Sequence, residues 1–105
     1  MMAMDAGLQV WLDTIPDTRP GVIVPYVRSP KNGTLRYQLS AVRQGRSGTS
    51  SIQQSGSVPL RADTPTALTR FSLSIGEQDQ CRIELILFAN GHPAGTYTFA
   101  CPRNP

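Results

Sequence analysis

Acidic residues are missing from the middle of this chain. No Asp or Glu lies between Thr18 and Ala62, although the stretch contains seven cations. These cations are Arg19, Arg28, Lys31, Arg36, Arg43, Arg46 and Arg61. Segregated charge of one sign attracts anionic partners over a Debye length of about 8–10 Å in physiological salt. The pattern favours an electrostatic interaction surface, and the alternative is a solvated face that prevents aggregation at sheet edges.

Long apolar segments are also missing. No stretch approaches the ~20 apolar residues of a membrane span, so we expect no membrane insertion. The first residues, MMAMDAG, lack the basic and apolar regions of a signal peptide. We expect residues 1–6 to be disordered or foreign to the native N-terminus. If the protein is exported, its signal is not in this sequence.

Residues with catalytic or metal-binding chemistry are scarce. His92 is the single histidine and lies beside Pro93 in a predicted turn, with no paired carboxylate or nucleophile on an element nearby. One histidine and two cysteines are too few for a zinc cage, and the acids lack the spacing of a calcium loop. Redox catalysis is disfavoured because neither C-x-x-C nor C-x-C occurs. We therefore expect a protein that is not an enzyme and uses no metal or cofactor.

The basic stretch also lacks the usual companions of nucleic-acid binding. Stacking aromatics are not interleaved with the cations; Tyr26 and Tyr37 are the nearest, and Tyr37 has the parity of a core residue. The segment Gly45–Gly48 lacks the Gly-Lys-Ser/Thr ending of a phosphate-binding loop. We expect no nucleic-acid partner. The alternative would show as steeply salt-dependent retention of DNA or RNA.

Short alternating apolar runs between nine glycines and nine prolines are what the sequence does contain, and they predict strands. The predicted strands cover about Leu8–Leu12, Val22–Val27, Leu35–Ala41, Thr49–Ser55, Phe71–Ile75, Cys81–Ala89 and Tyr97–Cys101. About seven antiparallel strands with a turn every eight to twelve residues are typical of an all-β, immunoglobulin-like β-sandwich. The length fits a single domain over residues 1–105.

Three details of this strand pattern can be tested. Pro25 cannot donate to a β-ladder, so its strand is predicted at a sheet edge or with a bulge. Residues 43–48 are predicted to form a loop, because they contain Gly45 and Gly48. Val58–Leu60 is predicted as an extended segment separate from the weak strand before it.

The two cysteines are predicted to lie opposite each other. A hairpin centred at Gly91 places Cys81 and Cys101 at equal distances along its two strands and on the same face, close enough for a disulfide. In the chain-entropy model such a bridge contributes roughly 3 kcal/mol. It would indicate an oxidising compartment. Two free buried thiols that pack as small apolar groups are the alternative.

Several segments together resemble the curli assembly inhibitors, the CsgC-like family, and within it the CsgH branch. They are VIVPYV, AVRQGRSGTSSIQQSGSVPLRADTPTALTRFSLSI and CRIELILF, and the similarity spans about Val22 to Phe99. The most specific parts are the basic loop at Arg43–Gly48 and the stretch Pro65–Ile75. Relatives with a C-x-C motif carry it where this chain has Gly33-Thr34-Leu35, so a redox role tied to that motif does not transfer.

The resemblance implies a periplasmic, monomeric, immunoglobulin-like domain that inhibits amyloid formation. Its expected partner is the amyloid-forming curli major subunit, with the curli export machinery as a second candidate. Family members act without ATP and at low ratios of inhibitor to subunit. The alternative is a structural or docking module of a secreted surface assembly, which would form a stable stoichiometric complex.

The expected client-binding residues are six of the seven cations of the acid-free tract and two that follow it. The main candidates are Arg28, Lys31, Arg36, Arg43 and Arg46, and the secondary ones are Arg61, Arg70 and Arg82. Strand parity predicts that Arg36 and Arg82 face outward and that Arg70 faces out from the opposite sheet. The contacts should be weak, because exposed ion pairs contribute only ~0–1 kcal/mol each.

Overall fold

The computed structural model describes residues 7–15, 21–46, 48–73, 75–76 and 78–102, and the chain there forms β-strands joined by turns and irregular segments. The strands are β1 (Gln9–Ile15), β2 (Gly21–Arg28), β3 (Gly33–Gly45), β4 (Gly48–Leu60), β5 (Thr66–Ala67), β6 (Phe71–Leu73), β7 (Gln80–Ala89) and β8 (His92–Ala100). No helix in these ranges is long and apolar enough to span a bilayer. Arg19 and residues 1–6 lie outside the described residues.

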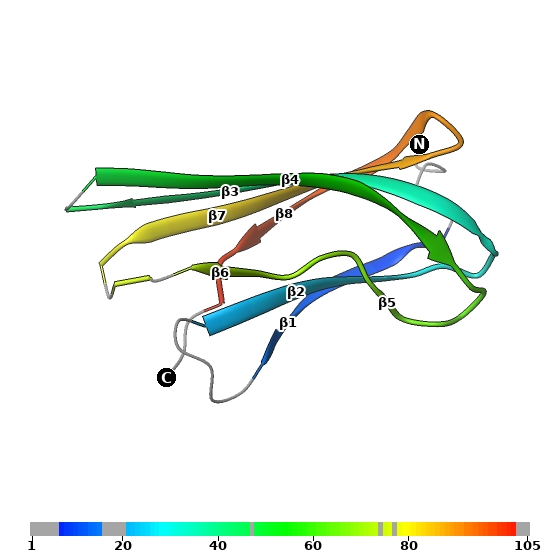
Figure 1. Ribbon diagram of the computed structural model, residues 1–105, viewed down its shortest axis with the longest axis horizontal. Helices are drawn as coiled ribbons and strands as arrows, with labels where there is room; N and C mark the ends of the chain where they lie inside the picture. Colours follow the sequence, from blue (N-terminus) through cyan, green and yellow to red (C-terminus); the bar gives the residue numbers. More distant parts are fainter. Residues whose placement is uncertain (1–6, 16–20, 47, 74, 77, 103–105) are drawn as a thin grey trace.

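Two antiparallel sheets face each other (Figure 1). The first sheet has the order β1-β2-β5, and β6 also pairs with β2. The second sheet has the order β4-β3-β7-β8. The predicted all-β sandwich is confirmed. The two-residue strand β5 was not predicted, because so short a segment has no alternation to recognise.

The longest hairpin joins β3 and β4 in a continuous register from Gly33 opposite Leu60 to Gly45 opposite Gly48. The predicted loop over residues 43–48 is therefore too long, since β3 extends to Gly45 and β4 begins at Gly48. The separation of Val58–Leu60 from the strand before it is also wrong. The first error arises because Gly45 and Gly48 suggested a loop. The second arises because Ser, Gln and Gly give β4 no apolar alternation, whereas its ladder to β3 makes it a strand.

Pro25 lies in the centre of the first sheet, which corrects the prediction of an edge strand or a bulge. On one side Pro25 is opposite Leu12 of β1. On the other side the partner is interrupted, because β6 pairs with β2 up to Ile23 and β5 pairs with it from Tyr26. The Leu68 N–H donates to the Pro25 carbonyl in this gap, at 2.9 Å. The break between β5 and β6 thus falls where proline offers no N–H.

The hairpin of β7 and β8 confirms the predicted alignment of the cysteines. Its register is regular from Arg82 opposite Ala100 to Leu87 opposite Gly95, and a bulge follows near the turn. Cys81 and Cys101 form a disulfide with their Cα atoms 5.4 Å apart. The alternative of free thiols is therefore wrong. The bridge fixes β8 to β7 at the end remote from their turn.

The core lies between the sheets. Ile83, Leu85 and Leu87 of β7 have no exposed surface, and Val27 and Phe71 of the first sheet belong to the same buried cluster. Because side chains alternate along a strand, the residues between the buried ones in the second sheet face away from the first sheet. The second sheet therefore has an outer face that is not covered by the first sheet.

Candidate interaction surface

The outer face of the second sheet is a broad surface of hydroxyl and amide side chains. We define this outer face by its residues. They are Thr34, Arg36, Gln38, Ser40, Val42 and Gln44 of β3, Thr49, Ser51, Gln53, Ser55 and Ser57 of β4, Gln80, Arg82, Glu84, Ile86 and Phe88 of β7, and Thr96, Thr98 and Ala100 of β8. Most are exposed polar residues without charge. Such a surface can exchange its hydrogen bonds with water for hydrogen bonds with a polypeptide, each with a net contribution of only about 0.5–1.5 kcal/mol.

Three charged groups lie on the outer face. Arg36 and Arg82 carry positive charge and Glu84 carries negative charge, so the face has a formal charge of +1. The Arg36 guanidinium lies over the Phe88 ring, 5.3 Å from its centroid. Arg82 is opposite Val42, six residues along β3 from Arg36, which corresponds to about 20 Å. The two arginines are thus separate positive points on a polar sheet.

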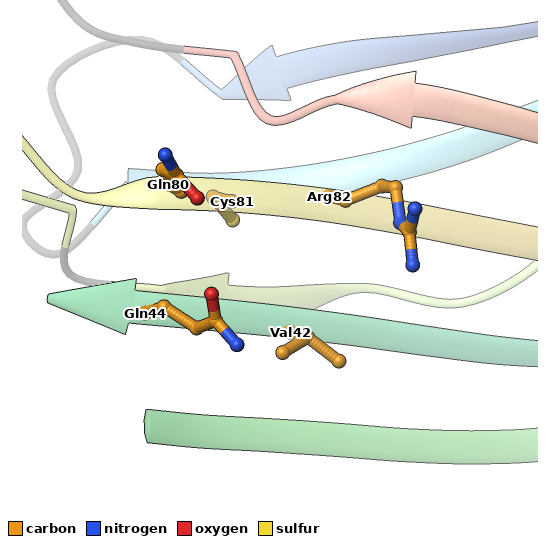
Figure 2. Close-up of a pocket in the computed structure, with 5 residues that line it drawn as sticks. All are labelled: Val42, Gln44, Gln80, Cys81 and Arg82. Atoms are coloured by element: carbon orange, nitrogen blue, oxygen red, sulfur yellow. The ribbon is translucent and has the colours of Figure 1, made fainter. Parts of the chain in front are cut away.

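Two open depressions lie on this face. One is lined by Gln38, Leu39, Ser40, Gln53, Gln54, Ser55, Glu84 and Ile86, from the three strands β4, β3 and β7. The other is lined by Val42, Gln44, Gln80, Cys81 and Arg82, and Figure 2 shows these side chains projecting from β3 and β7. Amide groups contribute to both depressions. Both depressions lie along β3 and β7, the two central strands of this sheet.

Arg28, Lys31 and Arg61 gather at one end of the sandwich. Arg28 ends β2, Lys31 lies in the turn that follows, and Arg61 directly follows Leu60, the partner of Gly33. All three cations are exposed. Asp63 lies at the same end, because its backbone N–H donates to the Ser29 carbonyl at 2.7 Å. Its carboxylate adds a negative charge to the three positive ones. This end therefore has mixed charge.

Arg43 lies beneath the hairpin, on the side of β3 that faces the interior. Its guanidinium pairs with the Asp79 carboxylate at 3.1 Å and donates to the Ser50 hydroxyl at 2.7 Å. The two paired side chains are only 21% and 14% exposed. The hairpin extends past the first sheet here (Figure 1), so a charged pair occupies the place of an apolar contact. The structure places Arg43 in a structural ion pair and outside the expected basic surface.

The remaining expected cations are dispersed. Arg46 is exposed at the tip of the hairpin, and Arg70 is exposed on the first sheet, just before β6. Arg36 and Arg82 face outward from the second sheet, as parity predicted. The structure brings Arg28, Lys31 and Arg61 to one end, and it brings no larger group of the expected cations together.

Sequence reasoning missed the partner of Arg43 and the polar character of the outer face. Asp79 lies in a loop, and only the pairing of β7 with β3 brings it to Arg43. The hydroxyl and amide outer face could have been found from SSIQQSGS, in which exposed Ser51, Gln53 and Ser55 alternate with less exposed residues. The acid-free tract led to the prediction of a basic surface, although uncharged polar residues are more numerous than charged ones on the outer face.

The fold and its surface define a small, disulfide-bonded β-sandwich with an open polar sheet face. The described residues contain no cluster of His, Cys, Asp or Glu that could hold a metal ion. The family model Tafi-CsgC, described as thin aggregative fimbriae synthesis protein, matches residues 1–93. The chain belongs to this family, which confirms the resemblance to CsgC-like proteins.

Individual relatives agree with this assignment. The curli assembly protein CsgC of Escherichia coli K12 is 32% identical over 75 residues, which cover 71% of this chain and 68% of the relative. The solved structure of E. coli curli protein CsgC is 26% identical, with a TM-score of 0.73, over 92% of this chain and 100% of that chain. CsgH of R. palustris has a TM-score of 0.71 at 15% identity, over 89% and 91% of the two chains, and shows the shared fold.

Proposed function

We propose that this protein acts in curli assembly as a periplasmic, chaperone-like inhibitor of amyloid formation by the curli subunit. It acts without ATP and at substoichiometric amounts, through transient contacts of the outer face with an unfolded or early oligomeric client. Membership in the Tafi-CsgC family and the 32% identical curli assembly protein support the pathway. The disulfide supports an oxidising compartment.

The observation that carries the proposal is the character of the outer face. It presents hydroxyl and amide side chains on a sheet tied by a disulfide, and it exposes Arg36 and Arg82 among them. Among the described residues, neither Arg36 nor Arg82 forms an ion pair with a carboxylate. Arg36 and Arg82 are therefore available to carboxylates and backbone carbonyls of a client.

Weak contacts are sufficient for this mechanism. Each exposed ion pair contributes only ~0–1 kcal/mol, so a client chain binds and leaves quickly. Cross-β growth requires flat strands that pair in register through free backbone groups. A client whose polar side chains are held briefly on the outer face presents fewer such strands. Because nuclei are rare, few inhibitor molecules suffice to delay growth.

The test compares the lag time of curli subunit aggregation, followed by dye binding, with and without the protein at substoichiometric concentration. We expect the wild type to lengthen the lag. The double variant Arg36→Glu with Arg82→Glu should lose most of this effect, because it reverses both positive points of the outer face. Arg70→Glu is the control, since Arg70 is also an exposed arginine but precedes β6 of the first sheet, and it should keep the effect.

Three results would decide against the proposal. An unchanged lag with wild-type protein refutes the inhibitory function. Equal losses in the double variant and in Arg70→Glu refute the outer face as the site. A stable stoichiometric complex by size exclusion, combined with an unchanged lag, identifies a structural or docking module instead.

A further inference from the structure

The edge of the second sheet formed by β4 is long, regular and free of charge. β4 spans Gly48–Leu60 and pairs with β3 along its whole length without a register shift. Among the described strands, β3 is its only ladder partner. Figure 1 shows β4, in green, as the outermost strand of its sheet. No Asp, Glu, Lys or Arg occurs within it.

Pro59 reveals which backbone groups of β4 face the open edge. It lies inside the ladder, opposite Thr34. Proline is tolerated there when its nitrogen points away from the neighbouring strand. Since N–H and C=O groups alternate in direction along an antiparallel strand, the residues at every second position before Pro59 share its direction. Their N–H groups face the open edge: they are Thr49, Ser51, Gln53, Ser55 and Ser57.

The other edge of the same sheet differs from β4. β8 contains Pro93, a bulge opposite Leu87 and Phe88, and Gly95 with a φ of 153°. Bulges and prolines are devices that keep an edge from pairing with another chain. β4 has no such device along the five open N–H groups. An unprotected edge of this length is a template for strand addition.

We propose that β4 accepts an extended client strand by β-augmentation, with an uncharged Ser- and Gln-rich centre and acidic residues at its ends. Arg46 precedes β4 and Arg61 follows it, so exposed cations mark both ends of an uncharged ladder. Acidic residues at the ends of a bound strand would meet these cations. The side chains of Ser51, Gln53 and Ser55 would continue in amide and hydroxyl ladders on the outer face.

The same cations argue against a second copy of this chain as the occupant. If two β4 strands paired antiparallel about their centres, Arg46 of each copy would approach Arg61 of the other. Like charges opposite each other in a ladder are destabilising. The cations therefore favour pairing of β4 with an acid-flanked strand of another protein, and they destabilise pairing of β4 with β4 of a second copy. This inference deepens the proposed function, on which the choice of an amyloid-forming client rests.

The experiment measures amide hydrogen exchange in isotope-labelled protein with a synthetic probe. The probe is a blocked peptide as long as β4, with alternating Ser and Gln flanked by Asp, and its counterpart has Lys flanks. The Asp-flanked peptide should slow exchange of the open N–H groups of β4. Ser55→Pro should abolish the slowing, because it removes a central donor while β3 keeps its ladder. Ser55→Ala should retain it, because that change removes only the hydroxyl.

A charge-swap variant keeps the test decisive if Ser55→Pro does not fold. The double variant Arg46→Glu with Arg61→Glu should reverse the preference, so that the Lys-flanked peptide protects the edge and the Asp-flanked one does not. Protection confined to β8, or equal behaviour of Ser55→Ala and Ser55→Pro, overturns the proposal. A concentration-dependent dimer that Ser55→Pro abolishes would assign the edge to a second copy instead.

The outcomes also separate this inference from the proposed function. Peptide binding is measured without any amyloid-forming protein, so it can succeed even if the wild type leaves the curli lag unchanged. If Ser55→Pro lengthens the lag as much as the wild type does, the edge is not the binding site although the inhibitory function stands.

Discussion

At the scale of single residues, Asp79 links three parts of the chain. One carboxylate oxygen accepts from the Gly76 N–H at 2.7 Å and from Arg43 at 3.1 Å. A side chain at Gly45 would collide with the same carboxylate, so the close approach requires glycine there. Asp79 therefore anchors the turn end of the β3–β4 hairpin, which carries much of the outer face and the proposed edge.

Replacing Asp79 should destabilise the protein. Asp79→Ala leaves the Arg43 guanidinium and the Gly76 N–H without this acceptor, and we expect a loss of about 1–3 kcal/mol in the free energy of unfolding. Urea denaturation measures it. Glu84→Gln serves as the control, because it removes an exposed carboxylate of the outer face and should change stability by less than about 0.5 kcal/mol. Similar losses in both variants would contradict the anchoring role.

At the scale of elements, the two hairpins of the second sheet differ in how well the sequence predicted them. Apolar alternation on both sides of Gly91 predicted β7, the second half of β8 and the position of the disulfide. The expected turn at His92 and Pro93 is wrong, because β8 begins at His92. The hairpin of β3 and β4 was predicted only in part, because β4 lacks apolar alternation and is stabilised by its pairing with β3.

Removing the disulfide should weaken the β7–β8 hairpin. Cys81→Ala combined with Cys101→Ala opens a loop with a sequence separation of 20 residues, and the chain-entropy model gives a loss of roughly 3 kcal/mol. Thermal or urea unfolding of the double variant measures this loss. The wild type treated with reductant should unfold like the double variant. If reductant destabilises the double variant as well, the effect does not come from this bridge.

At the scale of the whole molecule, the segregation of charge along the sequence does not persist in space. The acid-free tract includes β3, but β3 pairs with β7, which places Glu84 opposite Ser40 and brings Asp79 to Arg43. Asp63 likewise joins the cations at the end of β2. Acids from outside the tract are thus distributed among its cations. The electrostatic part of the proposed function consequently depends on a few exposed arginines.

Salt should therefore reduce the proposed inhibition only in part. The Debye length falls from about 10 Å at 0.1 M to about 3 Å at 1 M, so high salt screens the contribution of Arg36 and Arg82. Hydrogen bonds to the hydroxyl and amide groups and to the β4 edge persist. We expect a shorter but measurable extension of the curli lag at high salt, relative to subunit alone in the same buffer. Complete loss of the lag extension at high salt would show that charge alone supports the inhibition. An unchanged lag extension would show that charge does not contribute to it.

The sequence by itself determined the all-β class, the hairpin at Gly91, the disulfide and the outward direction of Arg36 and Arg82, because these follow from local alternation and turn chemistry. Only the tertiary structure decided which carboxylate meets which cation, that Pro25 lies at a break in its partner strand, and that β4 is an open edge. These features depend on which strands become neighbours. Strand neighbours are set by burial of the whole core, and no local pattern records them.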